Sequence, residues 1–269
     1  MALLLRSWNL FHGNAVPPER GAFLEEMIRA ATVDGPDVLF LQEVPVWGLR
    51  RLAAWSGMHV LGEVAARPRI GPLPSTAEIG RVLTDLHHGR TRSTFSGQAN
   101  AILVGPRLRV LRYDRIALNE RRFRAAQART LRLGLLTRLA WAKERRVCQA
   151  VRVAERGGRT LVLANLHATS FSADRRLADA EVIRAATFLE ALAAPDEPAV
   201  LGGDLNVRTA SSRALPELTT WGFSGGGTVV DHLLVRGAGH GTVTRWPDDR
   251  RRVGGRLLSD HAPLEVTIR

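Results

Sequence analysis

The chain has 269 residues, and its hydrophobic content of 45% is ordinary for a globular protein with a substantial core. No apolar run approaches the ~20 residues of a membrane span. The first residues, MALLLRSWNL, contain no small-residue cleavage site, so we expect no signal peptide. Cys148 is the only cysteine, which excludes an internal disulfide and indicates a reducing compartment, so we expect a cytoplasmic protein.

The net charge of +12 is concentrated in one segment of the chain. Residues 105–159 contain 16 Arg or Lys and 4 Asp or Glu, so the rest of the sequence is neutral. Such a basic segment attracts polyanions; we expect nucleic acid as its partner, with an anionic membrane as the alternative. Because all basic residues except Lys143 are Arg, a compositional bias of the source genome is the competing explanation. Nothing in the sequence points to an obligate protein partner.

The first half of the chain predicts short buried strands separated by two helices. The strands are expected at residues 3–9, 36–43, 58–64, 99–104 and 108–113, where apolar residues run together. A helix is expected at 17–32, with proline in its first turn and an apolar face from Phe23 to Ala31, and a shorter one at 47–55. Residues 67–97 are rich in Gly, Pro, Ser and Thr, which predicts a long surface loop with His87 and His88 solvated.

The second half begins with an arginine-studded helical pattern at 119–145. Its apolar stripe consists of Leu131, Leu135, Leu139 and Ala142, which suits a packed helix or one that lies on a membrane. A hairpin follows at 147–155 and 159–170, then an amphipathic helix at 173–194 and strands at 198–206, 228–236 and 260–268. Residues 248–252 are expected to form a solvated turn. This alternation favours an α/β fold with mixed sheets, in one domain over residues 1–269.

Polar side chains recur where the predicted strands end. They are Asn9, Gln42-Glu43, Asn165 with His167, Asp204 with Asn206, Asp231, and Ser259-Asp260-His261. Each alone fits a solvated turn residue; His12, which follows Asn9, could reach the site, but we favour a turn role for it. Together they indicate a site, because ligand sites of open α/β sheets gather at strand ends.

The residue types in this set indicate metal-assisted chemistry. Carboxylates of Glu43 and Asp260, with the amide oxygen of Asn9, suit Mg²⁺ rather than Zn²⁺. Histidines supply proton transfer near neutral pH, and Asp204 can accept a proton from water. The sequence contains no Gly-rich nucleotide loop before a helix and no G-x-S-x-G elbow, which argues against kinases, dehydrogenases and serine hydrolases.

The ordered set resembles the endonuclease/exonuclease/phosphatase superfamily, which has the deoxyribonuclease-I-like fold. The resemblance rests on Trp8-Asn9-Leu10, Gln42-Glu43, Asn165-Leu166-His167, Gly203-Asp204-Leu205-Asn206, Asp231-His232 and Ser259-Asp260-His261, and GQANAILV around Asn100 resembles an internal strand of that family. It implies a four-layer sandwich of two packed mixed β-sheets flanked by helices. It also implies metal-dependent cleavage of a phosphate ester.

The resemblance also assigns roles to single residues. Glu43 would be the main ligand of Mg²⁺, or of Mn²⁺ in its place, with Asn9 and Asp260 close to the metal. Asp204 would orient or deprotonate the attacking water with help from Asn206, while His261, positioned by Asp231, would bind the phosphate or donate a proton. His167 matches a second catalytic histidine, and Asn165 and Asn100 are expected to bind substrate.

The substrate is open between three hypotheses. The first is a Mg²⁺-dependent nuclease acting on DNA or RNA, with residues 105–159 tracking the nucleic-acid backbone. The second is a sphingomyelinase-like phosphodiesterase or phosphatase acting on a phospholipid or small molecule at a membrane. The third is a non-catalytic polyanion-binding protein. Residues 229–232 and 165–168 depart from the segments typical of inositol phosphatases and abasic-site endonucleases, which ranks both substrates low.

Overall fold

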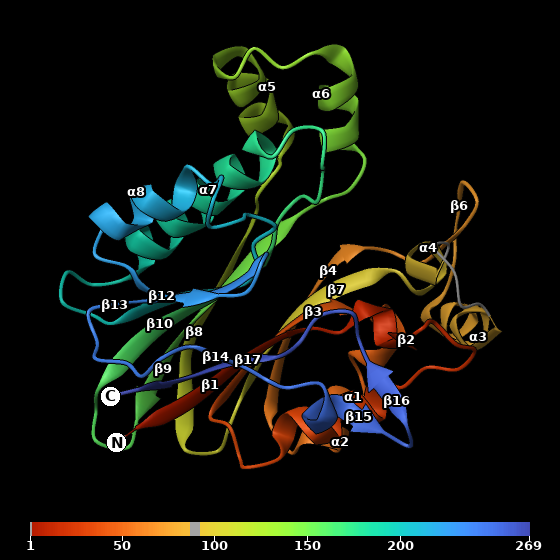
Figure 1. Ribbon diagram of the computed structural model, residues 1–269, viewed down its shortest axis with the longest axis horizontal. Helices are drawn as coiled ribbons and strands as arrows, with labels where there is room; N and C mark the ends of the chain where they lie inside the picture. Colours follow the sequence, from red (N-terminus) through yellow and green to blue (C-terminus); the bar gives the residue numbers. More distant parts are fainter. Residues whose placement is uncertain (1, 87–91) are drawn as a thin grey trace.

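The computed structural model describes residues 2–86 and 92–269, so His87 and His88 lie outside the described residues (Figure 1). Within these ranges, two large mixed sheets pack face to face, and helices cover their outer faces. This arrangement confirms the predicted four-layer α/β sandwich.

The first large sheet carries the strands near the chain termini. In spatial order it consists of β14 (Thr244–Arg245), β17 (Leu264–Ile268), β1 (Leu3–Asn9), β3 (Val38–Val44), β7 (Gln98–Val104) and β4 (His59–Ala66). Strands β1 and β3 run parallel, and their neighbours β17 and β7 run antiparallel to them. The carboxyl ends of β1 and β3 therefore lie at the same edge.

The second large sheet is assembled from the later part of the chain. In spatial order it consists of β12 (Ser224–Gly227), β13 (Asp231–Arg236), β11 (Ala199–Asp204), β10 (Thr160–His167), β9 (Val147–Glu155) and β8 (Leu108–Ala117). The predicted hairpin is confirmed as β9–β10, and β10 runs parallel to β11. Small sheets are formed by β15 (Arg252–Val253), β16 (Arg256–Leu258) and β2 (Ala15–Val16), and by β5 (Arg69–Ile70) with β6 (Leu73–Pro74).

The helices lie outside the sheets or beyond their ends. They are α1 (Leu24–Thr32), α2 (Leu52–Ser56), α3 (Ala77–Leu86), α4 (Arg92–Ser96), α5 (Arg121–Thr130), α6 (Leu135–Ala142), α7 (Arg176–Leu192) and α8 (Ala214–Thr220), with short 3₁₀ turns η1 (Phe11–Gly13), η2 (Val46–Gly48) and η3 (Asp249–Arg251). Helix α1 begins at Leu24, later than predicted, because Gly21 adopts a φ of 92° and interrupts the helical backbone before it.

Three apolar layers hold the sandwich together. Side chains such as Phe40 and Val200 fill the space between the sheets. Met27 and Ile28 of α1 pack on the outer face of the first sheet, and Val182 and Leu189 of α7 pack on that of the second. Burial of these side chains removes apolar surface from water and is the main stabilising contribution to the fold.

The prediction of a surface loop at 67–97 is wrong. The described part of this segment contains the β5–β6 hairpin and helices α3 and α4. Helix α3 begins after Thr76, whose hydroxyl accepts a hydrogen bond from the backbone N–H of Ile79 at 3.3 Å. The residues that suggested a loop, Pro74-Ser75-Thr76, are thus a hairpin end and a helix cap.

The helical pattern predicted at 119–145 is confirmed, but it does not form one continuous helix. It is divided into α5 and α6, because Arg132 adopts a φ of 51° and Gly134 has extended backbone. The predicted apolar stripe does not form one buried face, since Leu135 and Leu139 are exposed while Leu131 is half-buried. Among the described helices, none is long and apolar enough to cross a bilayer.

Candidate active site

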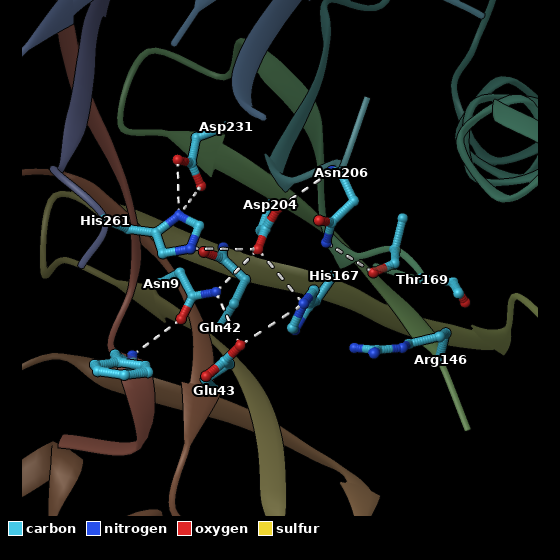
Figure 2. A network of polar contacts seen from close by, with 12 residues as sticks. Asn9, Gln42, Glu43, Arg146, His167, Thr169, Asp204, Asn206, Asp231 and His261 are labelled. Carbon is cyan, nitrogen blue, oxygen red and sulfur yellow. Dashed lines mark hydrogen bonds and ion pairs between the residues drawn. The ribbon is translucent and has the colours of Figure 1, made fainter. Parts of the chain in front are cut away.

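The site is formed where strands of the two sheets end side by side. Asn9 pairs with Gln42 across the parallel strands β1 and β3, and His167 pairs with Asp204 across β10 and β11. Asp231 lies opposite Asp204 on β13. Figure 2 shows these polar side chains converging from both sheets. Parallel pairing within each sheet, and packing between the sheets, therefore gather residues that are distant in the sequence.

Unusual backbone conformations turn several of these side chains toward one another. Glu43 has a φ of 52°, and the β3–β7 register shifts between Leu41 and Val44, so Gln42 and Glu43 do not continue the regular alternation of the strand. His12, Asn206 and Ser259 also have positive φ values, of 53°, 51° and 61°. Such conformations are disfavoured for residues with a Cβ and cluster at functional sites.

Asn9 links two carboxylates at the centre of the site. Its Nδ2 donates to Asp204 Oδ2 at 2.9 Å and lies 3.2 Å from Glu43 Oε1, while its Oδ1 accepts from the backbone N–H of Phe11 at 3.0 Å. Glu43 from the first sheet and Asp204 from the second thus face the same point.

A cavity of about 580 Å³ opens at this point. It is lined by Phe11, His12, Asn14, Pro18, Glu43, Arg92, Ser93, His167, Ser170, Asp204, Asn206, Asp260 and His261. Of the predicted site residues, Asn9 and Asp231 lie behind this wall and contact its members. The cavity is large enough for a phosphate ester and its neighbouring groups.

Asp204 is electrostatically poised between ionised and protonated forms. Burial, and after it the negative charge of Asp231, raises the pKa of Asp204 to about 7. The backbone N–H of Asn206 donates to Asp204 Oδ1 at 3.2 Å, which fixes the carboxylate plane. The Asn206 side chain itself donates to the Ala168 carbonyl at 3.0 Å. Asp204 can therefore accept a proton near neutral pH.

His261 is held as a cation by Asp231. Its Nδ1 lies 3.0 and 2.9 Å from the two carboxylate oxygens of Asp231, and its Nε2 faces Asp204 Oδ2 at 3.9 Å. Burial alone lowers the pKa of His261, but the hydrogen bond and charge of Asp231 outweigh it and raise that pKa to about 10. His261 thus offers a charged N–H to the cavity.

His167 has the opposite character. Its Nε2 lies 3.4 Å from Asp204 Oδ2, and its Nδ1 lies 2.7 Å from Nε2 of Gln98 at the start of β7. Burial, followed by the positive charge of Arg146, lowers the pKa of His167 well below its usual value. A neutral imidazole that accepts from Gln98 carries its proton on Nε2, which faces the cavity.

His12 lines the cavity from the 3₁₀ turn η1, so the alternative in which it reaches the site holds rather than the favoured turn role alone. Its Nε2 contacts Glu43 Oε2 at 3.0 Å, and its side chain is buried. Burial alone raises the pKa of the Glu43 carboxyl, but the charge and hydrogen bond of His12 outweigh it and hold that pKa well below its usual range. Only its spacing, three residues past the strand end at Asn9, could have indicated this position.

The predicted solvated turn at residues 248–252 is wrong at Arg251. This side chain is buried, and its NH1 donates to the carbonyls of Leu258, Ser259 and His261 at 3.0, 2.6 and 3.2 Å. Arg251 therefore holds the loop that carries Asp260 and His261. From the sequence alone, a buried arginine in a run of charged residues cannot be distinguished from its exposed neighbours.

We expect Arg251→Met to destabilise the protein by about 3 kcal/mol, because three backbone carbonyls lose a charged donor in a buried setting. The free energy of unfolding from urea titrations measures this effect. Arg252→Met, at an exposed neighbouring position, serves as the control. Equal stabilities of the two variants would show that the loop does not depend on Arg251.

The structure does not bring Asn165 and Asn100 to the cavity, which argues against the substrate-binding role predicted for them. Asn165 Nδ2 donates to the carbonyls of Leu41 and Ala101 on the opposite sheet, at 3.1 and 3.0 Å. Asn100 is buried and donates to the Val147 carbonyl at 3.3 Å. These amides satisfy backbone groups between the sheets and thereby fix how the sheets pack.

The donor set fits a divalent cation. Glu43, His167 and Asp204 present ligand atoms within 4.8 Å of one another, and so do Asp204, Asp231 and His261. Asp260 lines the same cavity. Burial, and to a smaller extent the negative charge of Glu43, raises the pKa of Asp260. Carboxylates that repel one another in a buried cavity are stabilised by a hard cation with oxygen ligands. Glu43 and Asp260 are the residues placed to hold it, next to Asp204.

Fold and site together define a class of protein, the two-sheet α/β sandwiches with a carboxylate–histidine site at the strand ends. The family model described as "Endonuclease/Exonuclease/phosphatase family" matches residues 7–261. The chain belongs to the endonuclease/exonuclease/phosphatase family and has its phosphoesterase fold. The recognition made from the sequence motifs is thus confirmed.

Solved structures share this fold at low sequence identity. A functionally unknown conserved protein from Enterococcus faecalis V583 is similar at 15% identity and TM-score 0.65, with 99% of each chain covered. A family member from Bacteroides vulgatus has 13% identity and TM-score 0.67, covering 100% of this chain and 99% of that one. TDP2 from Caenorhabditis elegans has 18% identity and TM-score 0.59, covering 100% and 74%. No curated protein matches the chain.

Proposed function

We propose that the protein is a divalent-metal-dependent phosphodiester hydrolase. The observation that carries this proposal is the placement of Asp204, which receives a hydrogen bond from Asn9, lies 3.4 Å from His167 Nε2 and faces His261 Nε2 at 3.9 Å in one cavity with Glu43. A base, a cationic donor and a second carboxylate thus surround a space of the size of a phosphate ester.

The residues divide the reaction among them. Asp204 accepts the proton of the attacking water, and the N–H of Asn206 keeps its carboxylate oriented. The Nε2–H groups of His261 and His167 donate to the phosphate oxygens, where negative charge grows during attack. Asp231 keeps His261 charged and aligned. A cation held by Glu43, Mg²⁺ or Mn²⁺, would neutralise phosphate charge and lower the pKa of bound water.

The substrate class is not set by this chemistry. A nuclease is the prediction from the basic segment at 105–159. A lipid phosphodiester is the second candidate, and the exposed leucines of α6 favour it. The cytoplasmic location stays a prediction from the single cysteine.

The proposed function predicts hydrolysis of bis-p-nitrophenyl phosphate with Mg²⁺ or Mn²⁺, and loss of at least about a hundredfold in rate when EDTA removes the cation. Restoring the cation should restore the rate. The same preparation is assayed with plasmid DNA, single-stranded DNA, RNA and sphingomyelin to rank the substrates. Hydrolysis that proceeds unchanged in EDTA, or no hydrolysis of any of these esters, would contradict the proposal.

A further inference from the structure

Exposed large apolar side chains are concentrated on two projections of the molecule. Among the described residues, eight of the twelve such side chains are Ile70, Leu73, Ile79, Val82, Leu86, Leu135, Leu136 and Leu139. We call residues 67–86 the α3 projection and residues 119–145 the α6 projection. Figure 1 shows them as separate projections with the ends of β4 and β7 between them. Exposed aliphatic side chains grouped in this way mark an interaction surface.

Helix α6 is apolar on two opposite faces. Its inner face is anchored by Trp141, which is buried against Leu133 and Leu177 and donates from Nε1 to Glu181 at 2.5 Å. The outer face exposes Leu135, Leu136 and Leu139 by 71%, 81% and 59%. These inner contacts are enough to hold the helix against the protein. The outer leucines are therefore not explained by the core.

Helix α3 repeats this pattern. Its inner face packs closely, since a Cβ on Gly80 would lie 2.6 Å from the Phe95 carbonyl and Thr84 is fully buried. Its exposed Ile79, Val82 and Leu86 follow a spacing of three and four residues and so form one stripe.

The α6 projection is strongly basic. The α6 projection has eight basic and two acidic residues, and Arg121, Arg124, Arg129, Arg132, Arg138 and Lys143 make no salt bridge with the carboxylates of the described chain. A cavity of about 510 Å³ between the projections is lined by Arg67, Arg69, Lys143 and Arg145, of which Arg145 pairs with Glu63, and by one carboxylate, Glu144. Ser93 lines both this cavity and the catalytic one, so the basic cavity adjoins the active site.

We propose that the α6 and α3 projections dock the mouth of the active site onto an anionic phospholipid membrane. The leucines of α6 enter the headgroup–acyl boundary, the arginines contact lipid phosphates, and the basic cavity accepts an anionic headgroup next to the catalytic cavity. Docking itself does not depend on the proposed function. The inference that the hydrolysed ester is a lipid headgroup rests on it.

The apolar side chains decide between a membrane and nucleic acid. Arginines alone bind either polyanion, because both present rows of phosphate groups. Nucleic-acid backbones, however, offer no apolar phase for three neighbouring leucines that stand clear of the protein surface. A membrane accepts both kinds of side chain at once.

Vesicle flotation tests the docking without any need for catalysis. The full chain is mixed with vesicles of phosphatidylcholine alone, or of phosphatidylcholine with phosphatidylserine. We expect binding to the anionic vesicles and little to the neutral ones. The triple variant Leu135→Ser, Leu136→Ser, Leu139→Ser keeps every charge and should bind at least about tenfold more weakly, because leucine transfer from water is lost.

Matched controls separate docking from folding and from chemistry. Val33→Ser removes an exposed apolar side chain before β3, at the opposite end of that strand from Glu43, and should bind as the unchanged protein does. All variants should keep their hydrolysis of bis-p-nitrophenyl phosphate, a readout that tests the proposed function separately.

Other outcomes overturn the docking proposal. Anionic vesicles that bind the triple leucine variant as tightly as the unchanged protein would show that charge alone acts. If the protein binds no vesicles but binds an oligonucleotide, the basic surface is a nucleic-acid-binding site instead.

Discussion

Replacing Asp204 with Asn should lower kcat on bis-p-nitrophenyl phosphate by about a thousandfold, within the range measured for general bases. The amide keeps the size of the carboxylate and can still contact Asn9, but it cannot accept a proton from water. Because the pKa of Asp204 is raised to about 7, the unchanged enzyme should also lose activity as the pH falls through that value. Steady-state kinetics with Mg²⁺ measures both effects.

Asp196→Asn is the control for this variant, since it changes an exposed carboxylate to an amide in the loop before β11. It should leave kcat unchanged. If Asp204→Asn retained activity within a few-fold of the unchanged enzyme, the proton would have to go elsewhere and the assignment of Asp204 as the base would be wrong.

The second large effect is expected at Asp231. Asp231→Asn removes the charge that holds His261 protonated and aligned, so kcat should fall by about a hundredfold or more. The pKa of His261, about 10 in the folded protein, should drop because its main negative partner is lost. The pKa of Asp204 should drop as well, because a like charge is removed.

Both limbs of the pH profile of kcat/KM should therefore move to lower pH in Asp231→Asn. Low pH inactivates by protonating Asp204, and a lower pKa moves that limb down. High pH inactivates by deprotonating His261, and a lower pKa moves that limb down too. Limbs that stay in place, with only the maximal rate reduced, would mean that Asp231 acts through geometry rather than charge.

The sequence predicted the residues whose place follows from strand ends. Glu43, His167 and Asp204 come directly from apolar runs, and parallel pairing takes such ends to one edge. Asn165 and Asn100 also lie near strand ends, but they bind backbone of the opposite sheet; Asn165 shares its face of β10 with His167 and lies one pair of residues deeper between the sheets. Spacing alone could not show how deep along the strand the cavity extends.

Other features depended on contacts that no local pattern records. Gln98 orients His167 only because β7 begins beside the end of β10. Arg251 is buried only because the loop seven to ten residues further on folds back and offers it three carbonyls. The exposed stripe on α3 lies in the segment 67–97, for which the sequence predicts a loop. The proline, serine and threonine residues of this segment favour that prediction more strongly than the apolar periodicity after them favours a helix.

The central claim is that Glu43 and Asp204, 161 positions apart in the sequence, meet at one divalent-cation site, with Glu43 as a ligand and Asp204 as the base beside it. Anomalous diffraction from crystals soaked in Mn²⁺ tests it most directly. The account predicts a manganese peak in the cavity beside these two carboxylates, and its absence from Glu43→Gln crystals treated in the same way. Saturating Mn²⁺ that leaves this cavity without a peak, or a peak that persists undiminished in Glu43→Gln, would contradict it.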